Sequence, residues 1–336
     1  MTYHFAPEIV RVAVVLGVVF SVLMYERVHL TTGGAIVPGY LAINLFSPLS
    51  VVTTLVGGVA TYYLVSVLLA KRTILYGRRK FEVEVLVGLA VGTAFSLLAA
   101  AFSNIDPYLG TMAGIGYLLP GIVAHDIARQ GIRKTLIAVT IVTVTLAAFL
   151  VGFNRILTIS PKDDLSTSLE IGTVTGFPRE LLLIAVAISV GYGMIVYSRL
   201  GARSGGFITG AYVALISPRL ADLVFTLATA VITWFVVTHV LMPRLLIFGR
   251  RKLATMLLIA ALTGWIIEVI AVLVTDGSYV PWRGMTIATL MVPALVANDA
   301  QRQGWKLTIV GTTVTAGLTA LTMAGVTALF DVSGIL

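Results

Sequence analysis

The chain has 336 residues, of which 58% are hydrophobic and only 11% are charged, and its mean hydropathy is +1.00. Soluble domains carry about 25% charged residues, so the composition excludes a soluble domain and predicts an integral membrane protein. The formal net charge of +8 therefore indicates membrane topology and not nucleic-acid binding, because Lys and Arg accumulate in cytoplasmic loops. The chain contains no cysteine, which excludes disulfides, thiolate catalysis and Cys-ligated metals.

Long apolar runs recur along the chain, and shorter ones lie between them. Each long run is close to the roughly 20 residues that a helix needs to cross a hydrocarbon core of about 30 Å. The alternation typical of a membrane β-barrel is absent, so we expect an all-α polytopic membrane protein whose helices satisfy their own backbone polar groups in lipid. The long runs lie at roughly 9–25, 49–70, 83–102, 135–153, 180–197, 220–241, 253–274 and 307–330, and the short runs at 34–47, 111–125, 205–217 and 284–297.

The second half of the chain repeats the first. Tyr76-Gly77-Arg78-Arg79-Lys80 returns as Phe248-Gly249-Arg250-Arg251-Lys252, 172 residues later, and Arg129-Gln130-Gly131 returns as Arg302-Gln303-Gly304, 173 residues later. Matches in one order and at nearly one spacing indicate a tandem duplication. We expect a first membrane repeat over 1–153, an extracytoplasmic linker over 154–178 and a second membrane repeat over 179–336.

The basic residues indicate whether the short runs cross the membrane. If they do, 17 of the 23 Lys and Arg residues fall on one side, which the positive-inside rule identifies as the cytoplasm. If the short runs are re-entrant, the basic loop 71–80 moves to the face opposite Arg27, and the rule fails in both halves. We therefore predict about six transmembrane segments per repeat. An even number makes the repeats parallel and places both termini and the linker outside.

The short runs are rich in glycine and proline. Segment 34–47 contains Pro38-Gly39, and segment 111–125 contains Pro120-Gly121. Short, broken helices at corresponding positions of two halves are typical of a substrate site or pathway. Close packing of helices on small residues explains the same glycines equally well. The sequence leaves both interpretations open.

Polar residues gather at the cytoplasmic ends of the predicted segments, and each group has a structural alternative. Glu26-Arg27 is either a solvated ion pair or an anchor for a charged substrate, and Ser198 replaces Glu26 in the second half. Asp126 and Arg129 stand three residues apart on one helix face, as do Asp299 and Arg302. Each couple is either a structural pair at a helix end, or part of a cytoplasmic gate or a docking surface for a soluble partner. The Gly-Arg-Arg-Lys loops serve positive-inside anchoring or an acidic partner. The candidate substrate-binding or partner-binding residues are Glu26, Arg27, Pro38, Gly39, Tyr40, Arg78, Arg79, Lys80, Asp126, Arg129, Gln130, Arg199, Arg250, Arg251, Lys252, Asp299, Arg302 and Gln303.

No motif predicts catalysis by the chain alone. A phosphate-binding loop, a pair of catalytic carboxylates and a metal-ligand spacing are all missing from the sequence, so we assign no catalytic residue, no metal and no cofactor. His125 is a weak candidate base, because Asn298 replaces it in the second half. Glu268 is the only carboxylate that we place deep within a predicted span, where an ionisable residue is a functional candidate by default.

Several motifs along both halves of the chain together resemble a known family. They are Glu26-Arg27, Val37-Pro38-Gly39-Tyr40-Leu41-Ala42, Ile74-Leu75-Tyr76-Gly77-Arg78-Arg79-Lys80-Phe81, Pro120-Gly121-Ile122-Val123-Ala124, Arg129-Gln130-Gly131, Val296-Ala297-Asn298-Asp299 and Gln301-Arg302-Gln303-Gly304. On these motifs the first half is similar to the PgsC/CapC family, the membrane subunits of poly-γ-glutamate capsule synthesis, over nearly all of 8–153, and the second half is similar to it again over 180–330. The chain thus resembles a fused pair of family units, with Pro38-Gly39 replaced by Gly210-Ala211 in the second half.

The resemblance implies a multi-pass subunit of the cell membrane. In this family a separate ATP-dependent amide ligase makes the polymer at the cytoplasmic face, so the implied partners are that ligase, other capsule-complex membrane subunits, the anionic polymer and membrane lipids, with no nucleic acid. It also implies that contacts made at Glu26 and Pro38-Gly39 belong to the first half. The alternatives are an independent secondary transporter or channel for a small anionic solute, and an assembly scaffold without a conduit.

Overall fold

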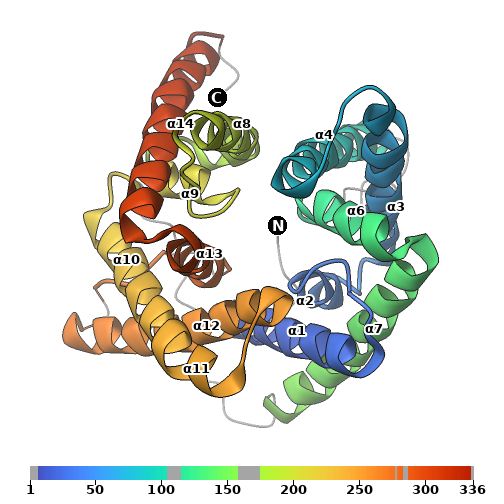
Figure 1. The fold of residues 1–336 in the computed structure, drawn as a ribbon, viewed down its shortest axis with the longest axis horizontal. Helices are drawn as coiled ribbons and strands as arrows, with labels where there is room; N and C mark the ends of the chain where they lie inside the picture. The colour runs from blue at the N-terminus through green and yellow to red at the C-terminus, as the bar shows by residue number, and fades with distance from the viewer. Residues whose placement is uncertain (1–6, 104–114, 158–174, 277, 283–286, 334–336) are drawn as a thin grey trace. The chain divides into compact units, whose positions relative to one another are not determined.

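The protein is described by a computed structural model that covers residues 7–103, 115–157, 175–276, 278–282 and 287–333. It divides into two compact units, residues 1–165 and 166–336. Every regular element among the described residues is a helix (Figure 1). Most of the linker that we predict over 154–178 lies outside these ranges.

The first unit alternates long and short helices. Its long helices are α1 (Pro7–Val28), α3 (Pro48–Tyr62), α4 (Gly77–Ser103) and α7 (Ile132–Leu157), and its short helices are α2 (Val37–Ile43) and α6 (Leu119–Gln130). The π-helical turn η1 (Tyr63–Leu68) and the 3₁₀ turn η2 (Leu69–Lys71) extend α3.

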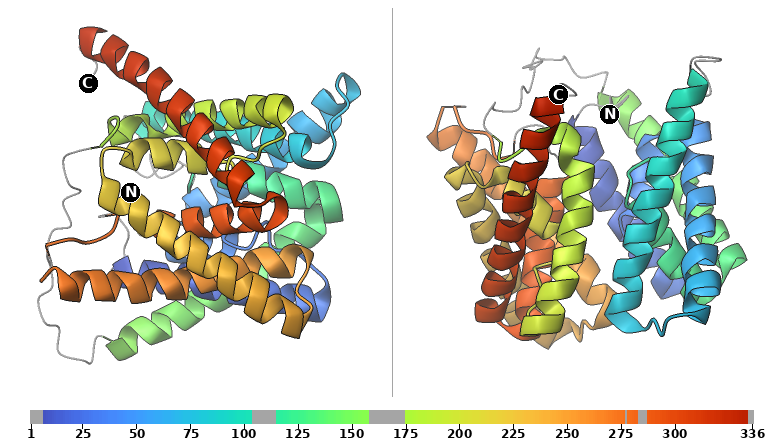
Figure 2. Two further views of the ribbon diagram at one scale, coloured as in Figure 1. Left: turned by 60° about the vertical axis from the view of Figure 1, so that its left-hand side comes forward. Right: turned by 90° about the horizontal axis from the view of Figure 1, so that it is seen from above.

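The second unit repeats this order of elements. Its long helices are α8 (Leu182–Leu200), which follows the 3₁₀ turn η3 (Arg179–Leu181), α10 (Leu220–Phe235), α12 (Gly249–Val274) and α14 (Trp305–Ser333). The π-helical turn η4 (Val236–Leu241) and α11 (Met242–Leu245) extend α10. The shorter helices are α9 (Thr209–Ile216) and α13 (Ala288–Gln303). The right-hand view of Figure 2 shows the long helices of this unit, yellow-green to red, running side by side.

The length and composition of the helices fit a membrane protein. Among the described residues, 8 helices are long and apolar enough to cross a membrane, four in each unit. The seven residues of α2 rise by only about 10 Å, so α2 cannot cross by itself. Pro38 and Pro120 are the second residues of α2 and α6, within the first turn, where a backbone N–H has no partner inside the helix and its absence costs nothing. The predicted fold class is confirmed: an all-α polytopic protein with a repeated unit and short Gly/Pro helices.

Contacts within the first unit give the direction of each short segment. Residues 84, 88 and 92 of α4 meet 125, 121 and 117 in turn, so α6 runs antiparallel to α4. Residues 54, 57 and 58 of α3 meet 115, 120 and 123, so α6 runs parallel to α3. The segment that contains α2 runs antiparallel to α1, because 21 meets 32 and 17 meets 39. Each short segment therefore carries the chain from one end of the unit to the other.

The two halves of the first unit are arranged as an inverted pair. Helix α2 packs on α1 of its own half and on α7 of the other, and α6 packs on α4 of its own half and on α3 of the other. The two short segments run antiparallel where Gly33 and Gly34 meet Val123 and Ile122. The second unit shows the same packing: α9 contacts α8 and α14, and α13 contacts α12 and α10. The tandem duplication thus contains an inverted arrangement inside each unit.

Candidate functional site

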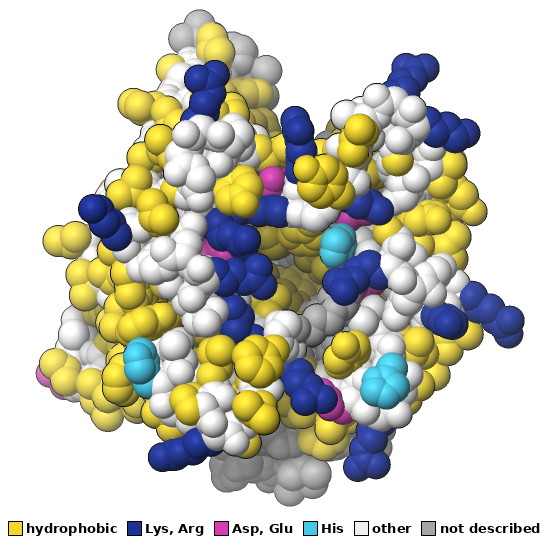
Figure 3. Space-filling model, viewed as in Figure 1, with side chains coloured by type: hydrophobic (Ala, Val, Ile, Leu, Met, Phe, Trp, Pro, Cys, Tyr) yellow, Lys and Arg dark blue, Asp and Glu magenta, His cyan; other side chains and the backbone are white. Residues whose placement is uncertain are grey.

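One end of each unit collects the basic side chains. In the first unit, α1, η2 and α6 finish at this end, and α4 and α7 begin there. We call it the basic end of the unit; in the second unit it is formed by the finish of α8, α11 and α13 and the start of α12 and α14. Dark blue Lys and Arg side chains gather on the face shown in Figure 3, with few magenta carboxylates among them.

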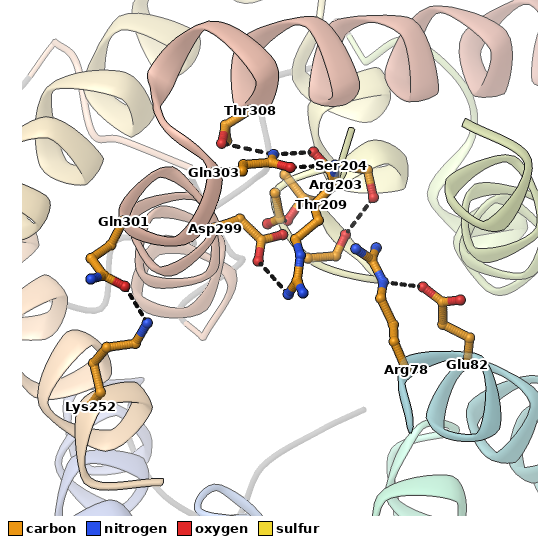
Figure 4. A network of polar contacts seen from close by, with 12 residues as sticks. Arg78, Glu82, Arg203, Ser204, Thr209, Lys252, Asp299, Gln301, Gln303 and Thr308 are labelled. Carbon is orange, nitrogen blue, oxygen red and sulfur yellow. Dashed lines mark hydrogen bonds and ion pairs between the residues drawn. The ribbon is translucent and has the colours of Figure 1, made fainter. Parts of the chain in front are cut away.

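A glutamine holds the basic end of each unit together. The Gln130 side chain accepts the Thr31 N–H at 2.9 Å and donates to the Thr31 carbonyl at 2.6 Å and to Thr135 Oγ1 at 2.9 Å. Gln303 makes the same three bonds to Arg203 and Thr308 (Figure 4). The glycine that follows each glutamine has φ of +91° or +84°, a conformation that glycine adopts readily. The repeated Gln-Gly therefore has a structural role.

In the first unit, carboxylates of α4 pair with Arg78 and Lys80 of the same helix. Arg78 Nε lies 2.5 Å from Glu82 Oε1, and Lys80 Nζ lies 3.7 Å from Glu84 Oε1. Glu84 is fully buried, and its Oε2 is 2.7 Å from His125 Nδ1 of α6. The cation at Lys80 thus faces a buried carboxylate one helical turn away on its own helix.

The second unit lacks both of these carboxylates. Ala254 and Met256 stand where the first unit has Glu82 and Glu84. Lys252 Nζ instead donates to Gln301 Oε1 at 2.5 Å, and Lys252 is only 6% exposed (Figure 4). Nearby, Arg203 NH1 lies 3.7 Å from Asp299 Oδ1. This end of the second unit therefore presents a different charge balance.

The remaining candidates are exposed cations, half-buried residues and buried packing residues. Arg27, Arg79, Arg129, Arg199, Arg251 and Arg302 are exposed, and the side chain of Arg250 lies outside what the structure describes. Glu26 and Tyr40 are half-buried. Pro38 and Gly39 are buried, and a Cβ on Gly39 would lie 2.9 Å from the Val14 Cα. Among the candidate residues, Pro38 and Gly39 serve helix packing.

The structure adds contacts to charged residues that the sequence did not predict. Asp299 lies 3.7 Å from Arg203, and it is buried while Arg302 is exposed; its pairing with Arg302 stays a prediction. Asp126 is likewise buried while Arg129 is exposed. Glu268 is not the only carboxylate within a long helix, because Glu84 lies two turns into α4 and is fully buried. In the sequence, Glu84 stands at the start of the apolar run 83–102 and looks terminal. Because α4 begins at Gly77, Glu84 lies inside the helix.

A second polar group that the sequence did not reveal lies at the opposite end of the second unit. Asp222 is fully buried and accepts hydrogen bonds from Tyr279 Oη at 2.8 Å and from the Trp282 N–H at 3.2 Å. Arg219 lies 3.0 Å from the other carboxylate oxygen. Burial and the bond to Asp222 raise the pKa of Tyr279 above its ordinary value. These hydrogen bonds hold Tyr279 and Trp282, in the segment before α13, against α10.

The side chains at the basic ends can bind an anion. The Lys252 ammonium, the guanidinium groups and the Gln301 amide offer hydrogen-bond donors. No group of three or more His, Asp or Glu side chains suited to a metal ion occurs in the part of the chain that the structure describes.

Comparison with known proteins identifies the repeated unit. The chain is 34% identical over 124 residues to PGA biosynthesis protein CapC of Bacillus subtilis (strain 168), an alignment that covers 37% of this chain and 81% of the relative. It is 33% identical over 125 residues to capsule biosynthesis protein CapC of Bacillus anthracis, covering 37% of this chain and 82% of the relative. Each relative is therefore about as long as one unit. No solved structure matches the chain. The sequence model of the family Capsule biosynthesis CapC matches twice, at residues 16–136 and 188–309, and the chain belongs to this family.

Proposed function

We propose that the chain is an integral membrane subunit of a poly-γ-glutamate capsule synthase and export complex in the cell membrane. The observation that carries this proposal is the double match to the CapC family, one match in each unit, together with relatives that are named as PGA or capsule biosynthesis proteins. A separate ATP-dependent ligase on the cytoplasmic side supplies the polymer, and other capsule membrane subunits complete the complex. The linker over 154–178 lies outside the cell in this account.

The basic ends support a role in receiving a polyanion. A surface of one charge raises the local concentration of an oppositely charged ligand and speeds its capture. The reception surface consists of eight arginines at the basic ends of the two units, and the anionic polymer or an acidic face of the ligase would meet it. Its arginines are Arg27, Arg78, Arg79, Arg129, Arg199, Arg250, Arg251 and Arg302.

An exposed arginine tests the reception surface. Arg79→Glu reverses one charge of the basic loop, and we expect less surface polymer while the protein still reaches the membrane. Glu180→Arg is the matched control, because it reverses the charge of an exposed residue at the opposite end of its unit, directly before α8. Unchanged polymer output from Arg79→Glu, at an unchanged protein level, would count against the proposal.

An independent secondary transporter for a small anion is the second candidate. The observation that favours it is the inverted arrangement inside each unit, since inverted repeats with short, interrupted helices are characteristic of secondary transporters. Purified chain in liposomes distinguishes the two candidates. Uptake of a small anion without any partner would favour the transporter, and uptake or polymer movement only with the ligase present would favour the capsule subunit.

A further inference from the structure

The two units differ in their charge balance at equivalent positions. Lys80 and Lys252 are both the fourth residue of their helices. One turn later the first unit has Glu84, whereas the second has the fully buried Met256. The second unit thus keeps the lysine and loses its counter-ion.

The second unit also adds a cation beside this lysine. Arg203 stands where the first unit has Thr31, and its guanidinium reaches Asp299. Lys252 interacts electrostatically with Arg302 and Arg203, both unfavourably, and with Asp299 favourably. Three cations therefore share one carboxylate. In the first unit, Lys80 lies 3.7 Å from Glu84, and the uncharged Thr31 stands in place of Arg203.

Burial makes this excess of charge costly without an anion. Lys252 and Asp299 are each only 6% exposed, and like charges repel more strongly where water is excluded. A buried cation is tolerated when it is paired, and Gln301 gives Lys252 a neutral acceptor only. An anionic group placed between Lys252 and the two arginines would offset the repulsion.

The donors are also held in place before any ligand arrives. Gln303 fixes the Arg203 backbone through both its N–H and its carbonyl, at 2.8 and 3.0 Å, while the Arg203 side chain stays 25% exposed. Gln301 holds the Lys252 ammonium in the same region (Figure 4). Donors that are fixed in advance lose little conformational entropy on binding.

We propose that Lys252, Arg203 and Arg302 form a binding site in the second unit for a carboxylate of a γ-glutamyl chain. The first unit has no such site, because Glu84 supplies the carboxylate internally. This inference rests on the proposed function for the identity of the ligand. The phosphate of an anionic lipid offers similar chemistry and is the rival source.

The exchange of Glu84 and Met256 provides the test. The full-length chain is placed in nanodiscs of neutral phosphatidylcholine, and binding of a fluorescent γ-linked glutamate pentamer is measured for the wild type, Met256→Glu and Lys252→Met. Both variants are expected to weaken binding by about tenfold or more, because each removes a charge interaction that the ligand makes. Glu84→Met, which gives the first unit the residue of the second, is expected to leave this affinity intact or to increase total binding.

Two controls keep the test decisive. Lys306→Gln lowers the net charge by one, as Met256→Glu does, but at an exposed residue near the start of α14. This variant is expected to retain binding. The thermal midpoint of each variant shows whether it folds. If Met256→Glu does not fold, Lys252→Met alone tests the site. Wild-type affinity in a folded Met256→Glu and in Lys252→Met would overturn the proposal. A second set of nanodiscs contains phosphatidylglycerol. The proposal would also be overturned if the wild type failed to bind the pentamer but bound this lipid, and if Lys252→Met abolished the lipid binding.

The outcome is separable from the fate of the proposed function. Binding is measured without cells, whereas the proposed function is judged by polymer at the cell surface. Loss of polymer on deletion of the chain, with binding indifferent to Lys252 and Met256, would reject the site alone. Normal polymer after deletion, with binding as expected, would reject the capsule role and leave a carboxylate site.

Discussion

Gly88 of α4 and Gly121 of α6 meet backbone to backbone. A Cβ built on Gly88 would lie 2.5 Å from the Gly121 Cα, closer than real Cβ atoms approach another atom. Gly17 and Gly39 make the equivalent contact between α1 and α2, with a Cβ on Gly17 placed 2.8 Å from the Gly39 Cα. Both short helices of the first unit therefore pack on a long helix through a pair of glycines, as small residues allow in membranes.

This contact predicts that Gly88→Ala destabilises the protein although alanine is the better helix former. The methyl group must push α6 away from α4, a cost of about 1–3 kcal/mol that exceeds the helix propensity gain of up to about 1 kcal/mol. The thermal midpoint in detergent measures the effect. Gly152→Ala in α7 is the control, because a Cβ there meets nothing within 4 Å. Equal midpoints for the two variants would contradict the close contact.

The glutamine bonds predict a local effect at each basic end. Gln303→Ala removes three hydrogen bonds between α13, the segment after α8 and the start of α14, and leaves the polar groups of Arg203 to find water. We expect a loss of about 1–3 kcal/mol in unfolding free energy and faster trypsin cleavage at Arg203. Gln130→Ala should destabilise the first unit equally without speeding cleavage at Arg203. Unaltered cleavage in Gln303→Ala would show that the bonds do not hold this segment.

Tyr279 predicts a dependence of stability on alkaline pH. Its folded-state pKa lies above its ordinary value, so its bond to Asp222 stabilises the fold fully below about pH 10 and is lost as the pH rises further. The difference in thermal midpoint between the wild type and Tyr279→Phe should therefore shrink above pH 10. Tyr117→Phe is the matched control, because Tyr117 is exposed. A difference that stays constant from pH 8 to pH 11 would contradict the assignment.

The long helices and the repeat could be predicted from the sequence because lipid imposes a length and a composition on every span. The paired charges could not. Arg203 and Asp299 lie 96 positions apart, and they meet because Gln303 draws the segment after α8 onto α13. Glu84 was not predicted to lie inside a helix because the apolar run begins several residues after the helix itself begins, at Gly77. From the sequence, Pro38 and Gly39 fitted a pathway and close helix packing equally well, and the close contact of Gly39 with Val14 of α1 is visible only in the structure.

The crossing of the short segments predicts a pattern of chemical labelling. The chain has no native cysteine, so single cysteines report sidedness directly. Ile74→Cys, at an 84% exposed position of the basic end, should react with an impermeant thiol reagent only from the cytoplasm. Ser47→Cys and Asp106→Cys should react from outside; Asp106 itself lies beyond the described residues. Gly77 is a poorer probe, because its φ of +58° disfavours a side chain. Labelling of Ile74→Cys from outside would reverse the topology.

The most direct test of the capsule role is the amount of γ-linked polyglutamate on the surface of cells that lack this chain. The polymer is released from washed cells, hydrolysed, and measured as glutamate per cell. We predict that deletion removes it, that the wild-type chain restores it, and that Lys252→Met restores less at an equal membrane level. Full surface polyglutamate in the deleted cells would contradict the account.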